Sequence, residues 1–532
     1  MGLPVTPLTW FAALLPIVVL LVLLLRLRWS AVEASVVSLA VAAVTALTVF
    51  DAPFALVGGE VGKGIWNSLA IIGITFPAVL MYEVSRQANG FAVIQREMTR
   101  LVPDRLLQVL ALGWCFTGFL QGPSGFGVPI AVAAPLLIGI GVKPLWAVVI
   151  PLMSQTWGTT FGTLALGWES LVLQTDLAQQ VGSARYWSTA FWSAVMTGTL
   201  CPVAGMLTCW FYGRWRGIWH GLPAVALLGG IQVLGLVALS QVTPVLSAVI
   251  PSTLALGAAF LVARLPVYAR PDTTPSALLN PSDNAVQADS PLGLHQALLP
   301  YYLLSIISVV VLLTPPLHDW LASWKTGFAF PQTQTGYGVV NPATGLYAPI
   351  AWLVHSGSFL LLTSALSAAY YARLGLIRRA DLRVIGRNTM QKAVPASLSV
   401  VFLIAMSKVM SGSGQVEVLA LGTASVTGPY FALLSPFIGV LGSFMSASNV
   451  SSNILFGQFQ QSMARLIGVN DLALLAAQTT GGAIGTMCSP STVMLGTTTA
   501  GIPGREGQVI SRLLVVVLAL ALCAGAAACL LG

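Results

Sequence analysis

Long apolar runs separated by short basic loops constrain this sequence more than any other feature. The runs Leu8–Leu25, Val36–Phe50 and Ile65–Tyr82 approach the length of about 20 residues that a helix needs to cross a bilayer. Only 8% of the residues are charged, whereas a soluble domain carries roughly 25%. The sequence therefore predicts an all-α polytopic membrane protein with about 12–14 membrane segments, some of them half-length.

The basic residues fall in connecting loops and predict how the helices are oriented. Arg26 and Arg28 follow the first run, and four arginines lie in the loop from Arg86 to Arg105. Because cytoplasmic loops are enriched in Lys and Arg, the N-terminus is predicted to lie outside the cell. The net charge of +8 comes from basic residues in these loops, so it is not evidence for a nucleic-acid partner. We expect the chain to be surrounded by the lipid bilayer and to bind no nucleic acid.

The least apolar stretch, rich in Pro, Ser, Asp and Asn, divides the chain into two parts. We interpret residues 271–294 as a cytoplasmic linker between an N-terminal membrane half, residues 1–270, and a C-terminal membrane half, residues 295–532. Each half is expected to contain one repeat with a broken helix, at residues 106–168 and at residues 431–500.

Two apolar segments are interrupted by polar and helix-breaking residues. Gln121-Gly-Pro-Ser-Gly-Phe-Gly-Val-Pro129 interrupts the first, and Ser446-Ala-Ser-Asn-Val-Ser-Ser-Asn453 interrupts the second. At bilayer depth the backbone can be opened in this way only where protein or a water-filled cavity satisfies its polar groups. Such breaks are typical of solute sites in transporters, although a proline kink with small residues for close packing is the alternative.

The two interruptions belong to an internal repeat. The offset of 327 positions that separates Ile140-Gly-Val142 from Ile467-Gly-Val469 also separates Thr159 from Thr486. The arginine pattern makes the first unit start inside the cell and the second start outside. Two similar units that enter from opposite faces form an inverted repeat, with a solute site near the midplane between them.

Four short motifs resemble the signature stretches of bacterial L-lactate permeases. They are Gly125-Phe-Gly-Val-Pro-Ile-Ala131, Ser451-Ser-Asn-Ile-Leu-Phe456, Thr479-Thr-Gly-Gly482 and Ser489-Pro490. The resemblance implies a bacterial cytoplasmic-membrane transporter of small 2-hydroxy-monocarboxylates such as L-lactate or glycolate, driven by co-transported protons. It also implies alternating access in an ion-transporter fold of two inverted repeats with hairpins.

The sequence departs from that family at three intramembrane charges. The family typically has a glutamate at the position of Gln121, an aspartate at that of Asn449 and a lysine at that of Thr486. All three positions are neutral here. The departures leave open a transporter of the same fold for a different small solute, or a channel-like facilitator.

Most candidate substrate-binding residues lie in the two breaks and in the motif Thr479-Thr-Gly-Gly482. Backbone N–H, hydroxyl and amide groups there can bind a carboxylate or a 2-hydroxyl. Their alternative role is hydrogen bonding between helices. The candidates are Ser124, Gly125, Phe126, Gly127, Ser451, Ser452, Asn453, Thr479, Thr480, Gly481, Gly482 and Lys408. Lys408, on an otherwise uncharged segment, either binds the carboxylate or extends toward the membrane surface.

Two titratable residues are candidates for proton coupling. The imidazole of His355 titrates near neutral pH and lies in an apolar run, where a packing role is the alternative. Glu83 ends a membrane helix beside Arg86, and a local ion pair is the alternative there.

The sequence contains no motif for catalysis, a metal or a cofactor. Its six cysteines form no CxxC or Cys/His spacing, and no nucleophile–base pair or nucleotide-binding loop is present. We therefore predict a transporter, not an enzyme, whose partners are a small monocarboxylate, a proton and the lipid bilayer. The sequence assigns no oligomeric state.

Overall fold

The computed structural model describes residues 3–27, 29–125, 127–270, 276–280 and 292–532, and it is mostly helical. The α-helices are α1 (Pro7–Leu21), α2 (Ala31–Thr48), α3 (Phe54–Gln87), α4 (Gly90–Leu101), α5 (Arg105–Leu110), α6 (Phe116–Gln121), α7 (Val128–Gly139), α8 (Pro144–Ser154), α9 (Gly162–Leu173), α10 (Ala184–Gly198), α11 (Leu200–Ser240), α12 (Val249–Val262), α13 (Leu294–Ala297), α14 (Leu299–Leu313), α15 (Pro315–Ala322), α16 (Ser356–Arg373), α17 (Arg379–Gly412), α18 (Gln415–Thr427), α19 (Phe431–Ser446), α20 (Asn449–Ile467), α21 (Asp471–Gly485), α22 (Pro490–Thr499) and α23 (Glu506–Leu531). Short π-helical or 3-10 turns occur at Val22–Arg26, Ala111–Cys115, Thr156–Gly158, Asp176–Gln179, Pro244–Leu246 and Gly428–Tyr430.

The predicted fold class, an all-α polytopic membrane protein, is confirmed. In the described part of the chain, 8 helices are long and apolar enough to cross a membrane, or up to 9 if the bent pair Leu299–Leu312 and Pro315–Ala322 is one span. Shorter apolar helices such as Val128–Gly139 and Gly162–Leu173 supply half-length segments. The sequence-based count of membrane segments included such half-length pieces, so it exceeds the number of full spans.

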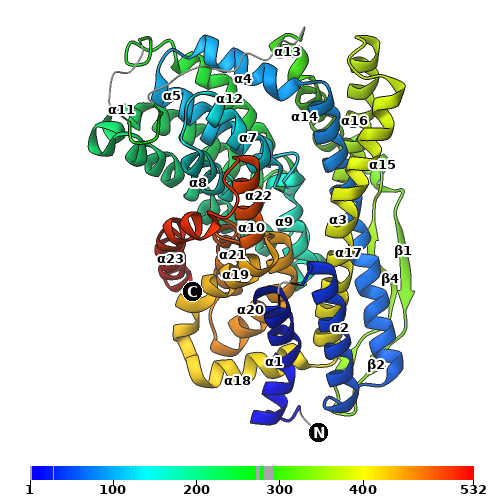
Figure 1. Cartoon of the computed structure of the whole chain (residues 1–532). Helices are drawn as coiled ribbons and strands as arrows, with labels where there is room; N and C mark the ends of the chain where they lie inside the picture. Colours follow the sequence, from blue (N-terminus) through cyan, green and yellow to red (C-terminus); the bar gives the residue numbers. More distant parts are fainter. Residues whose placement is uncertain (1–2, 28, 126, 271–275, 281–291) are drawn as a thin grey trace.

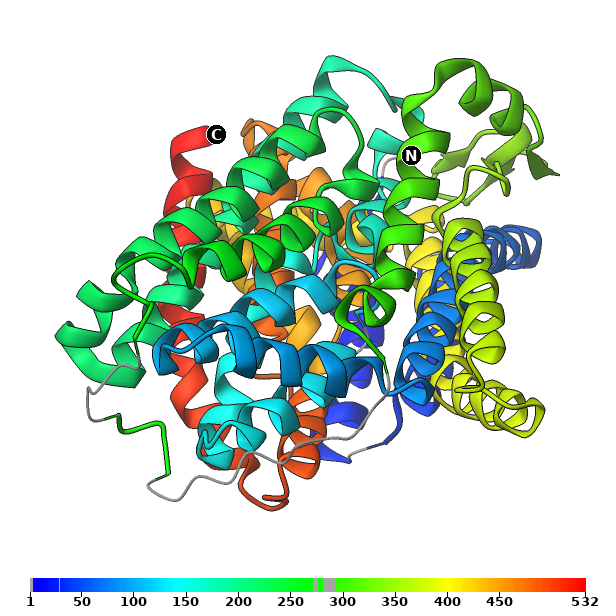
Figure 2. The same cartoon turned by 90° about the horizontal axis from the view of Figure 1, so that it is seen from above.

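One long helical stretch, Ala184–Ser240, folds back on itself. Gly213 (φ −146°, ψ 22°) and Arg214 (φ 54°, ψ −135°) break α11. A Cβ on Gly217 would collide with the carbonyl of Cys209, because the two parts of the helix pack closely after the break. Figure 2 shows the two parts of α11, in green, side by side. This stretch therefore contains two antiparallel segments.

The helices form two groups. In Figure 1, α2, α3, α16 and α17 stand on one side, with α17 packed against α2 and α3 and α16 against α3. The other group contains α5 to α12 and α19 to α23, with α19 packed against α21 and α23. Helix α20 contacts α9 of its own group and also α17 of the group formed by α2, α3, α16 and α17. The second repeat therefore lies next to that group.

A small β structure follows α15. Strand β1 (Thr326–Phe330) pairs antiparallel with β4 (Thr344–Ile350), and β2 (Thr333–Gln334) pairs with β3 (Val340–Asn341). The indole of Trp66 on α3 donates a hydrogen bond to the backbone oxygen of Ala348 (3.0 Å). The polar connector of the sequence is thus structured and attached to α3.

The helical elements repeat with the offset seen in the sequence. Helix α8 begins at Pro144 and α21 begins 327 positions later, at Asp471. The turns that precede them contain Gly141 (φ 91°) and Gly468 (φ 71°), both in the left-handed region that glycine adopts at low cost. The pair α7–α8 therefore corresponds to the pair α20–α21.

The described part of the linker contacts the first of these turns. The backbone N–H of Lys143 donates to the oxygen of Leu278 (2.7 Å), and that of Asn280 donates to the oxygen of Gly141 (2.8 Å). Most of the predicted linker, residues 271–275 and 281–291, lies outside the described residues.

Candidate functional site

A cavity of about 70 Å³ lies where the broken helices of the two repeats meet. A water molecule needs about 10–15 Å³ of such space, so the cavity has room for a solute of a few non-hydrogen atoms. Its fourteen lining residues are Gln121, Gly127, Gln155, Thr159, Gly162, Thr163, Leu166, Gly167, Ala447, Ser448, Asn449, Val450, Thr486 and Thr492.

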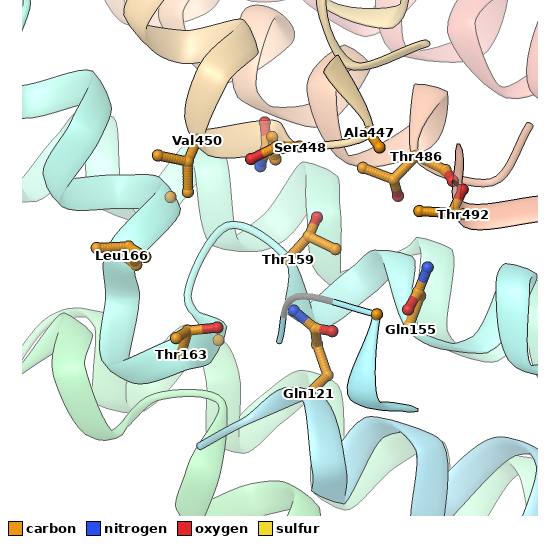
Figure 3. A pocket seen from close by; sticks show the side chains of 14 residues that line it. Gln121, Gln155, Thr159, Thr163, Leu166, Ala447, Ser448, Val450, Thr486 and Thr492 are labelled. Carbon is orange, nitrogen blue, oxygen red and sulfur yellow. Dashed lines mark hydrogen bonds between the residues drawn. The ribbon is translucent and has the colours of Figure 1, made fainter. Parts of the chain in front are cut away.

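The lining comes from equivalent positions of the two repeats. The offset of 327 positions relates Gln121 to Ser448 and Thr159 to Thr486, and all four residues line the cavity. In Figure 3, Gln121 and Thr159 on one side face the segments that carry Ser448 and Thr486 on the other. The three positions at which the sequence departs from the permease pattern, Gln121, Asn449 and Thr486, all belong to this lining.

Three helices begin at the cavity. Gly127 precedes α7, Ser448 precedes α20, and Thr492 lies in the first turn of α22. Prolines in the first turn of α7 and α22 fit these starts, because proline there needs no hydrogen-bond partner. Each N-terminus carries about half a positive charge, so their convergence favours an anionic group.

Four other helices end at the same cavity. Gln121 is the last residue of α6, and Gln155, Ala447 and Thr486 follow α8, α19 and α21. Helix C-termini present backbone carbonyls with a partial negative charge. The cavity therefore offers donors and acceptors together, which suits a solute that has both an anionic group and a hydroxyl or a proton.

Among the fourteen described residues that line the cavity, none carries a charge. The polar side chains are amides and hydroxyls, and these groups do not titrate near neutral pH.

The wall of the cavity at the start of α9 has an unusual backbone. Thr163, Leu164 and Ala165 have φ values of 51°, 54° and 63°, in the left-handed region. For residues with a Cβ this conformation costs roughly 1–2 kcal/mol each. The backbone N–H of Leu164 donates to the oxygen of Gly122 (3.1 Å), so the strained turn is attached to the first break.

A buried hydrogen-bond network joins the two repeats directly behind the cavity. The amide nitrogen of Asn449 donates to the hydroxyls of Thr160 (3.1 Å) and Thr479 (3.3 Å), which are 3.0 Å from each other. The amide nitrogen of Asn453 donates to the Thr479 hydroxyl (3.0 Å) and to the backbone oxygen of Gly167 (3.0 Å). Because Thr160 and Gly167 belong to the first repeat, the network fixes one repeat against the other.

The amide oxygen of Asn449 has no hydrogen-bond partner among the described residues, although its residue is only 4% exposed. Buried polar atoms are nearly always paired. This oxygen packs against Gly482 of α21, where a Cβ would collide with it.

The predicted residues of the first break occupy different positions. Gly127 lines the cavity. Ser124 is buried and donates its hydroxyl to the backbone oxygen of Leu120 (2.5 Å). Gly125 (φ 51°) lies so close to the Thr163 side chain that a Cβ would collide with it. Phe126 lies outside the described residues. Of this set, only Gly127 is placed at the cavity, and the role of each as a ligand remains a prediction.

The predicted residues of the second repeat lie mostly behind the cavity. The hydroxyl of Ser452 donates to the oxygen of Gly439 (2.8 Å), and the backbone N–H of Ser451 donates to the Ser448 hydroxyl (3.3 Å). Asn453 and Thr479 belong to the network behind the lining. Thr480 faces a separate apolar groove, and its hydroxyl has no partner among the described residues.

Two predicted glycines allow helices to approach closely. A Cβ on Gly481 would collide with the carbonyl of Pro436, and one on Gly482 would collide with the amide oxygen of Asn449. Any larger residue at position 482 would therefore displace Asn449, which lines the cavity. The two glycines position the site through packing, and direct binding by them remains a prediction.

Lys408 lies at the boundary between the two groups of helices. Its ammonium group donates to the backbone oxygen of Leu173 (3.3 Å), the last residue of α9. A cation at a helix C-terminus is favourable because it offsets the negative end of the dipole. Lys408 is not among the residues that line the cavity.

The two coupling candidates also lie away from the cavity lining. His355 caps the start of α16, where its Nδ1 accepts from the backbone N–H of Gly357 (3.4 Å). Glu83 is only 2% exposed and pairs with Lys392 (2.6 Å) and Arg86 (3.4 Å). Glu83 thus joins α3 to α17 through an ion pair.

Most of the lining was absent from the predicted site. The residues not predicted as ligands are Gln121, Gln155, Thr159, Gly162, Thr163, Leu166, Gly167, Ala447, Ser448, Asn449, Val450, Thr486 and Thr492. Two signals in the sequence pointed to some of them: the 327-position offset, which pairs Thr159 with Thr486, and the three neutral departures. The strained turn at Thr163 had no sequence signal.

The comparisons with known proteins agree with one another on a single family. A family model described as L-lactate permease matches residues 9–532 of this chain. The chain is 28% identical over 503 residues to an L-lactate permease of Halalkalibacterium halodurans, covering 93% of this chain and 91% of the relative.

Two relatives from Escherichia coli strain K12 are similar at the same level. The chain is 28% identical over 526 residues to an L-lactate permease, with 94% of this chain and 92% of the relative covered. It is 27% identical over 525 residues to glycolate permease GlcA, with 93% and 90% covered.

Proposed function

The chain belongs to the L-lactate permease family, and from that membership we propose that it is a secondary active transporter of a small 2-hydroxy-monocarboxylate such as L-lactate or glycolate. Family membership makes the chain a multi-pass membrane transporter and not an enzyme. The observation that supports the proposed substrate class is the cavity shared by the breaks of both repeats, with three helix N-termini at its lining.

The substrate carboxylate would bind at the helix N-termini. Ser448 and Gly127 mark the starts of α20 and α7, where backbone N–H groups lack partners within their helices. The 2-hydroxyl would bind amide and hydroxyl groups of the lining, such as those of Gln121 and Gln155. A cavity of about 70 Å³ has room for a small solute such as a three-carbon acid.

The proton would enter with the substrate. No described lining residue is charged, and both His355 and Glu83 lie outside the lining. An anion without a compensating charge is costly at membrane depth, so binding of a proton together with the carboxylate lowers that cost. Transport would then move no net charge across the membrane.

Alternating access between the two repeats would move the site from one side to the other. The correspondence of α7–α8 with α20–α21 supports an inverted repeat, and the network around Thr479 connects the repeats. We place the protein in the bacterial cytoplasmic membrane with its N-terminus outside, because the arginine-rich loops would then be cytoplasmic.

The neutral lining favours a second candidate, a transporter of the same fold for a small neutral hydroxylated solute. Amide and hydroxyl groups bind such a solute without any charge to balance. Uptake of a neutral solute would not change with the proton gradient, whereas uptake of the monocarboxylate would.

Uptake of labelled L-lactate into proteoliposomes tests the proposal. We expect saturable uptake that an acidic exterior accelerates and an imposed membrane potential leaves unchanged. An absence of saturable lactate and glycolate uptake under every gradient would reject the substrate class. Saturable uptake driven by the potential alone would reject the co-bound proton and leave the substrate class intact.

A further inference from the structure

A second cavity, of about 640 Å³, lies beside the break in α11 and shares no described lining residue with the first cavity. Its lining residues are Trp146, Phe211, Tyr212, Gly213, Arg214, Arg216, Ala277, Ser511, Arg512 and Val515. They come from α8, α11, α23 and the described part of the linker. We call this cavity the arginine pocket.

Among the residues that the structure describes, the lining of the arginine pocket is positively charged. Arg214, Arg216 and Arg512 line it, and none of the described lining residues is acidic. Among the described residues, none of these three arginines forms an ion pair. Three guanidinium groups around one cavity present paired N–H donors in the geometry that a phosphate oxygen pair accepts.

Aromatic rings hold two of the guanidinium groups. The guanidinium of Arg512 lies 4.9 Å from the ring centre of Trp146, and that of Arg214 lies 5.0 Å from the ring centre of Trp210. Arginine stacked on an aromatic face loses less freedom when it binds an anion. The two side chains are thus ordered before a ligand arrives.

The pocket lies at the ends of apolar helices. Tyr212 ends the first part of α11, α8 begins at Pro144, and Arg512 lies in the first two turns of α23. Next to the pocket, Trp215 is 66% exposed and Trp219 is 70% exposed. Tryptophan is enriched where membrane-spanning helices meet the lipid headgroups, which places the pocket at headgroup depth.

We propose that the arginine pocket binds the headgroup of an anionic phospholipid, with the phosphate between the arginines and the glycerol region against Trp146 and Phe211. The charge, the apolar rings and the position at helix ends fit a lipid better than a soluble anion, because the apolar surface of Trp146 and Phe211 would stay unoccupied beside a bound soluble anion. Basic pockets between membrane helices bind acidic lipid headgroups by this combination. The site is independent of the proposed lactate transport.

Thermal unfolding of the purified full-length protein in detergent tests the proposal. Phosphatidylglycerol, phosphatidylcholine and inorganic phosphate would be added separately to the wild type, to Arg214→Gln/Arg512→Gln and to the control Arg379→Gln/Arg383→Gln. The control removes two exposed arginines of α17 that lie outside the pocket. Each basic residue near an anionic lipid contributes a factor of about five in affinity, so the pocket variant should bind phosphatidylglycerol roughly 25-fold more weakly.

We expect phosphatidylglycerol alone to raise the unfolding temperature of the wild type and the control, and to have little effect on the pocket variant. Equal stabilisation of the pocket variant, equal effects of phosphatidylcholine, or full stabilisation by inorganic phosphate would each overturn the proposal. A photoreactive phosphatidylglycerol analogue, applied to the wild type, provides a measurement that does not depend on folding of a variant. Cross-links in peptides of α8, α11 or α23 support the site, and cross-links confined to other helices reject it.

Discussion

The hydroxyl oxygens of Thr160 and Thr479 lie 3.0 Å apart, although 319 residues separate them in the sequence. Thr160 belongs to the first repeat, between the turn Thr156–Gly158 and α9, and Thr479 lies on α21 of the second. Asn449 and Asn453 donate to the Thr479 hydroxyl as well. The Thr479 side chain therefore contacts Thr160 of the first repeat and also Asn449, which lines the cavity.

Thr479→Val should destabilise the protein. The valine keeps the size of the side chain but leaves the Asn453 amide without one of its two acceptors, and a buried unpaired donor costs about 1–3 kcal/mol. The measurement is the unfolding temperature of the purified protein. Thr480→Val is the matched control, because the Thr480 hydroxyl is buried without a partner among the described residues and its loss should change the temperature little. Equal losses in the two variants would contradict the role of the network.

Asn449→Ala should weaken substrate binding. The substitution removes a polar side chain from the cavity lining, and loss of one hydrogen bond to the substrate corresponds to about a three- to ten-fold rise in KM for L-lactate. Ser451→Ala changes a buried neighbour that does not line the cavity, so its KM should stay close to that of the wild type. A larger effect at Ser451 than at Asn449 would place the substrate elsewhere.

Lys408→Met separates the two roles open to that lysine. As a cap on α9, the ammonium group contributes about 0.3–1 kcal/mol to stability, and its loss should lower the unfolding temperature slightly while KM for lactate stays within about two-fold. If Lys408 binds the carboxylate, KM would rise much more than ten-fold. Measurement of both quantities on one variant decides between the cap and the ligand.

The fold followed from the sequence where a pattern extends over many residues. Hydrophobic runs predicted the helices, and Gly141 and Gly468, which the 327-position offset relates, lie in the turns before α8 and α21. The sequence could not show that Ala184–Ser240 doubles back at Gly213, since an apolar run gives no direction in space.

The site was harder to predict than the fold. At the second break the sequence motif drew attention to Ser451 and Ser452, whereas Ser448 and Asn449, at the start of α20, line the cavity. Which residue of a broken helix faces the cavity depends on where the next helix begins, and that is fixed by capping within one or two residues. Thr163 reaches the cavity through a left-handed turn that its own sequence does not favour.

The central claim is that the two breaks form one substrate site, and protection of an introduced cysteine tests it most directly. Thr486→Cys would be made in a protein in which the exposed Cys523 and Cys529 are replaced by Ala, leaving four native cysteines that are buried. After lactate uptake by this variant has been verified, its reaction rate with a small thiol reagent would be measured with and without L-lactate. We predict that saturating lactate slows the reaction several-fold, whereas an unchanged rate in a transporting protein would contradict a site between the two breaks.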